Sequence, residues 1–270
     1  MKDYEEQVRR HYDSAIFEAE LARLSRDCLL ESAITCRHLE RHIPAGACVL
    51  EIGVGGAYYT ELLARRGCRL HLVDISARLL ENAVAKLESS GIGVAGATRA
   101  SATSMAMPET GRFDVALLLG PLYHLCTPED RQAAVRETRR VLKPGGLLFA
   151  AGINRLAYLR EHFRRSPEQV LDRREFHERH LLDGNLDPEH APPIGYAHLT
   201  GVEEFRELLR DAFAEIALVG VESFAAPWQD VYARLSQEEQ QAWLDLIERT
   251  GATPEGRGQA DHFLFIGRAV

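Results

Sequence analysis

Apolar runs and amphipathic segments alternate along this chain. Residues 3–42 carry apolar positions at helical spacing with charges between them, and Pro44 and Gly46 end the pattern, which predicts a helix. The apolar run CVLEIGV predicts a buried strand, TELLARRG a helix and RLHLVDIS a second strand. ARLLENAVAKLESSG, closed by a glycine, predicts a further helix. Because a helix connects them, the two strands must run parallel.

The alternation continues to about residue 153 and then changes. TRASATSM predicts a weak third strand, FDVALLLG a fourth and GLLFAAGI a fifth, with the amphipathic helix PEDRQAAVRETRRVL before the last. Residues 154–200 are rich in charges, histidines and prolines, which predicts an insertion of helices and loops over the active site. GVEEFRELLRDAF then predicts a helix, EIALVGVES a sixth strand and DHFLFIGRAV a final strand. We expect an α/β fold with a doubly wound sheet, forming one domain over residues 1–270 with an N-terminal helical cap over residues 1–43.

Charge and cysteine content restrict the possible partners. The formal net charge of −8 argues against nucleic acid or an anionic membrane as the main partner, because either would need a basic stripe. The five cysteines form no CxxC pair, so we expect neither a disulfide framework nor a metal site. No apolar signal region opens the chain. We therefore expect a cytoplasmic protein with a small-molecule substrate, acting as a monomer or homodimer.

The segment EIGVGGAYYT joins a strand to a helix through a glycine-rich turn. Gly53 and Gly55 allow positive φ and close approach of a ligand, and the helix N-terminus offers unpaired N–H groups. Asp74 ends the next strand, where its carboxylate can accept both hydroxyls of an adenosine ribose. A dinucleotide turn would need glycine where Tyr58 stands. The pattern E/D-x-G-x-G-x-G fits better, with Ala57 replacing its last glycine.

The motifs EIGVGGAYYTELLARRG, LHLVDIS, FDVALLLGPLYHL and VLKPGGLLF follow one another between residues 45 and 153. In order and spacing they resemble the successive motifs of class I S-adenosylmethionine-dependent methyltransferases. The resemblance implies a Rossmann-like seven-stranded sheet, mostly parallel with an antiparallel last strand. It also implies S-adenosylmethionine as the cofactor.

The resemblance further implies a role for individual residues. Gly53 and Gly55 would back the methionine part, Asp74 would hold the ribose and Ile75 would pack on the adenine. The family often has an acidic residue after the third strand that accepts from the adenine amine, and Ser101 stands at that position here. The full set of implied cofactor-binding residues is Tyr12, Glu51, Gly53, Gly55, Asp74, Ile75, Ser101, Ala102, Leu119 and Gly120.

Candidates for catalysis follow the fourth and fifth strands or lie in the insertion. His124 has a suitable pKa to remove a proton from an acceptor, and Tyr123 could orient a substrate or cover the sulfonium. Asn154 could bind a substrate or cap the helix that follows it. Tyr196 would reach the pocket if the insertion folds over the sheet.

Three functions stay open from the sequence. The leading hypothesis is a methyltransferase acting on a small molecule. The first alternative is a cyclase that closes the methionine chain of the cofactor into azetidine-2-carboxylate and releases methylthioadenosine. The second alternative is a non-catalytic binder of S-adenosylmethionine, which the departures at Ala57 and Ser101 suggest.

Overall fold

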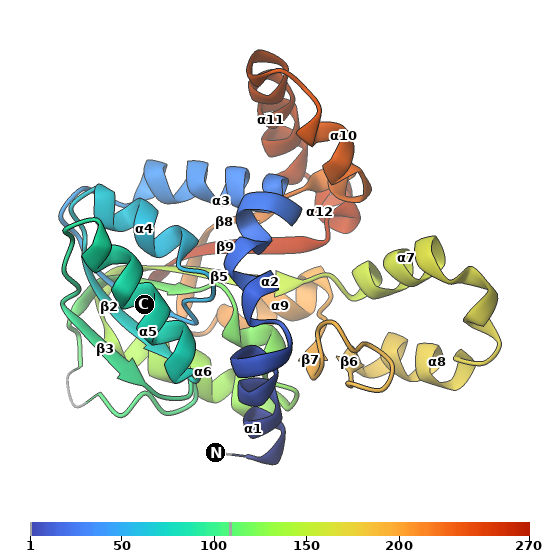
Figure 1. Ribbon diagram of the computed structural model, residues 1–270, viewed down its shortest axis with the longest axis horizontal. Helices are drawn as coiled ribbons and strands as arrows, with labels where there is room; N and C mark the ends of the chain where they lie inside the picture. The colour runs from blue at the N-terminus through green and yellow to red at the C-terminus, as the bar shows by residue number, and fades with distance from the viewer. Residues whose placement is uncertain (1, 108–109) are drawn as a thin grey trace.

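Seven strands form one twisted sheet in the order β3-β2-β1-β4-β5-β9-β8 in the computed structural model, which describes residues 2–107 and 110–270 (Figure 1). Neighbouring strands from β3 to β5 pair in parallel, whereas β9 runs antiparallel to both β5 and β8. The predicted sheet, mostly parallel with an antiparallel last strand, is therefore confirmed. The strands are β1 (Cys48–Ile52), β2 (Arg69–Asp74), β3 (Gly96–Arg99), β4 (Phe113–Leu118), β5 (Leu142–Ile153), β8 (Phe213–Gly220) and β9 (His262–Ala269).

Both faces of the sheet are covered, as a doubly wound fold requires. In β4, Val115 and Leu117 belong to the core on one face, and Ala116 and Leu118 to the core on the other, as the pleat dictates. The first face packs against α3 (Leu29–His42), α4 (Tyr58–Arg65), α5 (Ala77–Ser89) and α11 (Gln237–Gly251), and the second against α6 (Pro128–Val141) and α9 (Val202–Leu209). The remaining C-terminal helices are η5 (Ser223–Trp228), α10 (Gln229–Ala233) and α12 (Pro254–Gln259).

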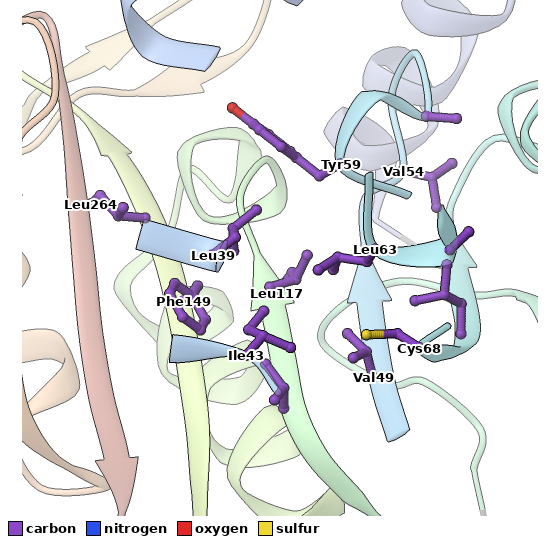
Figure 2. Packing of buried hydrophobic residues seen from close by; sticks show 14 of the residues in the cluster. Leu39, Ile43, Val49, Val54, Tyr59, Leu63, Cys68, Leu117, Phe149 and Leu264 are labelled. Atoms are coloured by element: carbon purple, nitrogen blue, oxygen red, sulfur yellow. The ribbon is translucent and has the colours of Figure 1, made fainter. Parts of the chain in front are cut away.

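Helix α3 belongs to the core of the sheet. Its residues Leu39 and Ile43, the latter just beyond its end, lie beside Phe149 of β5 and Leu264 of β9 (Figure 2). Leu39 and Phe149 are fully buried, and burial of such side chains stabilises the fold by about 2 kcal/mol each. Within the predicted cap of residues 1–43, α3 therefore covers a face of the sheet.

The residues before α3 are not one continuous helix, so the expectation of a single helix over 3–42 was wrong. The chain forms α1 (Asp3–Arg10), η1 (His11–Ala15), α2 (Phe17–Ala22) and η2 (Arg23–Asp27). Both η1 and η2 are π-type turns, in which Ile16 N donates to His11 O and Cys28 N to Arg23 O. Such wide turns interrupt the helical pattern and rotate side chains onto a new face.

The segment from α1 to α2 crosses the carboxyl ends of the strands. Polar contacts hold it there: Ser76, after β2, donates to Asp13, and Arg78 donates to Asp13 O at 2.7 Å. Ser101, after β3, donates to Glu5 at 2.6 Å. These contacts connect the start of the chain with loops that are distant in sequence.

The insertion after β5 has two parts. Its helices α7 (Arg155–Arg165), η4 (Pro167–Val170) and α8 (Arg174–Asp183) extend away from the sheet as an arm (Figure 1). The strands β6 (Asn185–Leu186) and β7 (Ala197–His198) belong to the returning part, where Thr200 N donates to Ile153 O at 2.8 Å. The returning part, rather than the arm, lies beside the carboxyl end of β5.

Strand β3 is shifted relative to the prediction. TRASATSM covers residues 98–105, but β3 ends at Arg99, and Ser101 pairs with Ser104 in a tight turn instead. The hydroxyl of Ser101 accepts from Thr103 N at 3.2 Å, which satisfies the turn locally.

The glycine-rich turn after β1 is a point of close contact between three segments. Gly53 and Gly55 have φ of +80° and +48°, so both adopt the left-handed conformation expected for them. A Cβ atom on Gly53 would lie 2.7 Å from Pro121 Cδ, and one on Gly56 would lie 2.9 Å from Leu21 Cα. Ala57 also has positive φ, at +58°, which explains why glycine suits its position.

We expect Gly53→Ala to cost substantially more stability than Gly46→Ala. Gly46 also has positive φ (+77°), but a Cβ atom there meets nothing within 4 Å, so its substitution costs only backbone strain of about 1 kcal/mol. Gly53→Ala adds the clash with Pro121, a further cost of about 1–3 kcal/mol. Urea unfolding of both variants measures the difference, and equal costs would contradict the close contact.

Candidate functional site

A cavity of about 960 Å³, including its open mouth, lies at the carboxyl ends of β1, β2 and β4. This is where ligands bind in doubly wound sheets, and the size suits a nucleoside-sized molecule. Every residue that the sequence proposes for cofactor binding lines this one cavity: Tyr12, Glu51, Gly53, Gly55, Asp74, Ile75, Ser101, Ala102, Leu119 and Gly120.

Asp74 is buried and fixed by the glycine turn. Its two carboxylate oxygens accept from Val54 N and Ser76 N, each at 2.8 Å. Burial raises the pKa of Asp74 to about 6, although these backbone donors favour the ionised form. Each oxygen keeps a further lone pair, so the carboxylate can still accept from two hydroxyl groups of a ligand.

Glu51 is a buried carboxyl group with an unsatisfied oxygen. Its Oε2 has no hydrogen-bond partner among the described residues, and the side chain lines the cavity. Burial raises the pKa of Glu51 to about 8, so the carboxyl is protonated at neutral pH in the unliganded protein. A cationic ligand group nearby would favour its ionisation, which fits the ammonium of a methionine chain.

Ser101 is accompanied by a carboxylate from the start of the chain. Its hydroxyl donates to Glu5 Oε1 at 2.6 Å, and Glu5 Oε2 accepts from Lys2 N at 3.0 Å. Glu5 is 6% exposed and lines the cavity. The carboxylate of Glu5, which belongs to α1, therefore lies beside Ser101, at the position where related methyltransferases often have an acidic residue.

His124 is buried and both of its ring nitrogens are occupied. Nδ1 lies 2.9 Å from the carbonyl oxygen of Tyr196, and Nε2 lies 2.8 Å from the hydroxyl of Tyr12. The carbonyl can only accept, so Nδ1 carries the proton and Nε2 accepts from Tyr12. Burial lowers the pKa of His124 to about 4, which keeps the ring neutral. Tyr123 lies in the same wall, and burial raises the pKa of its phenol.

Two of the four predicted catalytic side chains lie elsewhere. Asn154 caps α7: its Oδ1 accepts from Leu156 N at 3.0 Å, and its Nδ2 donates to Ala260 O at 2.8 Å. Its amide is thus used within the fold, outside the residues that line the cavity. The ring of Tyr196 lies beside that of Tyr4, with centroids 6.5 Å apart, in a separate shallow pocket. Only the backbone carbonyl of Tyr196 reaches the site, because the returning part of the insertion passes η3 (Pro121–His124) at this point.

The cavity also contains a charged group that the sequence analysis missed. Arg23 of η2 lies 2.7 Å from Glu31 and 3.4 Å from Glu20, and all three line the cavity. Behind them, His262 Nδ1 lies 2.6 Å from Glu222. Although burial alone would lower the pKa of His262, Glu31 and Glu222 raise it to about 9. Only the π-type turn brings Arg23 inward, and no sequence pattern indicated that turn.

Among the residues that the structure describes, one group could hold a metal ion by distance alone. The ligand atoms of Glu31, Glu222 and His262 lie within 4.8 Å of one another. Their hydrogen bonds and the ion pair with Arg23 account for this arrangement without a metal.

In the part of the chain that the structure describes, no helix has the length and apolar character needed to cross a membrane.

Comparisons with known proteins agree with this geometry. Residues 49–146 match the family model described as a methyltransferase domain. The ubiquinone biosynthesis O-methyltransferase of Xanthomonas axonopodis pv. citri is 36% identical over 113 residues, which is 42% of this chain and 45% of that protein. The protein of the same name from Pseudomonas paraeruginosa is 38% identical over 117 residues, which is 43% of this chain and 48% of that protein. The chain thus spans about half the length of the curated relatives it matches.

A solved structure shares the whole fold. The N-methyltransferase NodS from Bradyrhizobium japonicum, in complex with S-adenosyl-L-homocysteine, superposes with a TM-score of 0.56 and 16% identity, covering 99% of both chains. At this identity the likeness concerns the fold alone. Together, the methyltransferase domain matched over residues 49–146 and the sheet order support the resemblance to class I S-adenosylmethionine-dependent methyltransferases.

Proposed function

We propose that this protein transfers the methyl group of S-adenosylmethionine to a small-molecule acceptor. The observation that carries the proposal is the single cavity in which the glycine turn, Asp74 and the orphaned carboxyl of Glu51 converge within the matched methyltransferase domain. The family match ends at residue 146, before the insertion and the loops that would select an acceptor.

The lining residues fit the three parts of the cofactor. Asp74 would accept from the ribose hydroxyls, and Glu5 with Ser101 would face the adenine amine. Glu51 would pair with the methionine ammonium, whose charge would favour ionisation of this buried carboxyl. Arg23, which lines the cavity beside Glu20 and Glu31, would face the methionine carboxylate. Tyr12 and Tyr123 would place aromatic surface near the sulfonium. When bound, the cofactor supplies an electrophilic methyl group on a positively charged sulfur.

The hydrogen-bond chain through His124 would accept the proton of the acceptor. Tyr12 oxygen can take that proton while its own moves to His124 Nε2, and the imidazolium formed would keep its Nδ1–H bond to Tyr196 O. With a pKa of about 4, His124 is a weak base. A weak base suffices for a hydroxyl acceptor, which becomes strongly acidic as the C–O bond forms, but not for an ammonium. The weak basicity of His124 therefore favours an oxygen acceptor, in line with the O-methyltransferases that match the chain.

Other parts of the proposal concern the setting of the protein. All five cysteines are free, which supports a reducing, cytoplasmic location. We propose a chain that works as one domain, as a monomer or homodimer, without nucleic-acid or membrane partners.

Product analysis tests the reaction directly. The protein is incubated with S-adenosylmethionine, with and without an extract of small hydroxylated and aminated metabolites, and the products are measured by mass spectrometry. We expect S-adenosylhomocysteine and a methylated compound only when the extract is present, and at least tenfold weaker cofactor binding for Asp74→Asn. Methylthioadenosine formed from the cofactor alone would overturn methyl transfer in favour of cyclisation. Cofactor binding without any product would favour the non-catalytic binder.

Glu5 should set the preference for an adenine amine. We expect Glu5→Gln to weaken the binding of S-adenosylhomocysteine about tenfold, because a charge-assisted hydrogen bond becomes a neutral one. Binding of S-inosylhomocysteine, which lacks the amine, should change less than twofold. Calorimetry with both ligands measures the two affinities. The control is Glu6→Gln, which lies beside Glu5 but pairs with Arg9 and Arg10 instead. Equal losses for both ligands would count against this role.

Glu51 should make the stability of the cofactor-free protein depend on pH. Its folded pKa of about 8 exceeds the ordinary value of 4.5, so between these values the folded protein holds a proton that the unfolded chain lacks. Stability is therefore lost as the pH rises through this window. Glu51→Gln removes this loss, so the variant should gain roughly 2–4 kcal/mol relative to the wild type between pH 5 and pH 8.5. Urea unfolding at both pH values measures the gain, and parallel profiles of the two proteins would contradict it.

A further inference from the structure

A second pocket, of about 760 Å³, shares a wall with the cofactor cavity. The shared wall is η3, from which Pro121 and His124 face the cofactor cavity, Leu122 faces the second pocket and Tyr123 borders both. The other walls come from α6, α9 and the returning part of the insertion. Because η3 follows β4, the pocket lies beside the carboxyl end of the sheet, where ligands bind in this fold.

Arg131 of α6 is a buried cation in this pocket. The residue is 8% exposed, and its Nη1 donates to Leu125 O at 2.8 Å. That carbonyl is the only hydrogen-bond partner of the guanidinium among the described residues, and none of their carboxylates lies within the 4.0 Å of an ion pair with it. Burial lowers the pKa of Arg131. A buried charge without a counterion is costly, and a bound anion would offset that cost.

The charge of Glu204 raises the pKa of Arg131 in part, but neither acidic residue of the pocket forms an ion pair with it. Glu204 forms an ion pair with Arg155, lies 2.9 Å from His198 Nε2 and accepts from Gly201 N at 3.2 Å. Glu207 lies at the exposed rim, 3.8 Å from Arg210. Both carboxylates thus pair with other residues. Because their negative charges would repel an anion, they disfavour a ligand with more than one negative charge.

The remaining walls define the rest of the ligand. Leu122 and Phe205 are each 2% exposed and, with Leu208 and Pro128, give the pocket an apolar lining around Arg131. The planar guanidinium matches the two oxygens of a carboxylate. We propose that this pocket binds a small organic monocarboxylate, with its carboxylate on Arg131 and its apolar body between α6 and α9. The proposal does not depend on methyl transfer. It implies a ligand that contacts η3, and with it Tyr123, from the side opposite the cofactor.

Ligand-observed NMR with benzoate and benzamide as probes tests the proposal. The protein is saturated with S-adenosylhomocysteine, so that benzoate cannot report binding to Arg23 in the cofactor cavity. We expect saturation transfer to benzoate with a Kd in the millimolar range, which suits so small a molecule, and none to the neutral benzamide. Phenyl phosphate, a dianion of similar shape, should bind more weakly than benzoate.

Variants assign the binding to this pocket. Arg131→Met should weaken benzoate binding at least tenfold, whereas Arg136→Met, which removes an exposed arginine from the same helix, should leave it unchanged. Leu208→Trp fills the pocket while keeping Arg131, so it tests the site even if Arg131→Met does not fold. The proposal would be overturned if benzamide bound as tightly as benzoate. It would also be overturned if a folded Arg131→Met or Leu208→Trp variant bound benzoate as tightly as the wild type does. Tighter binding of phenyl phosphate would overturn the preference for a monocarboxylate.

Discussion

The close packing around the glycine turn is the constraint on which the site depends. Gly53, Gly55 and Gly56 leave no side chain between β1 and its neighbours, so Pro121 and the backbone of α2 can approach the turn directly. The same turn presents Val54 N to Asp74, which fixes the carboxylate at the end of β2. One short segment therefore positions the loop after β4, the N-terminal helices and the acidic residue at the same time.

The site is built from two kinds of parts. The ends of the parallel strands supply Glu51, Asp74, Leu119 and Gly120, whose places follow from the sheet order alone. The N-terminal segment supplies further polar groups, including Glu5, Tyr12 and Arg23, across long separations in sequence. Glu51 and His124 are both buried in this cavity, and burial shifts their pKa values in opposite directions: upward for Glu51 and downward for His124. The cavity thus holds a neutral acid and a neutral base in one enclosed space.

Sequence periodicity and turn chemistry predicted most of the strands, the glycine turn and the acid at the end of β2, whereas the antiparallel last strand and the other proposed cofactor residues were implied by the resemblance to the methyltransferase family. The pattern is local there: an apolar run, a glycine turn and an acid at the next strand end specify their own geometry. The N-terminal segment was harder, because a π-type turn adds one residue per turn without a distinctive composition. Of the two roles that the sequence left open for Asn154, the structure shows helix capping, and the side chain of Tyr196 lies outside the cofactor cavity. The positions of these two side chains depend on which residues the insertion contacts in the folded protein. The charged sequence of the insertion does not predict those contacts.

The position of α2 has a consequence for the timing of any reaction in the cavity. Leu21 and the backbone of Glu20 lie against the glycine turn, while the buried Phe17 and polar contacts to the loops after β2 and β3 hold the rest of the N-terminal segment. Glu5, Val8, Tyr12 and Arg23 of this segment line the cavity. Under the proposed function, exchange of the cofactor would require the segment to move away from the strand ends, and the rate of that movement would then set an upper limit on turnover, whatever the speed of the chemical step.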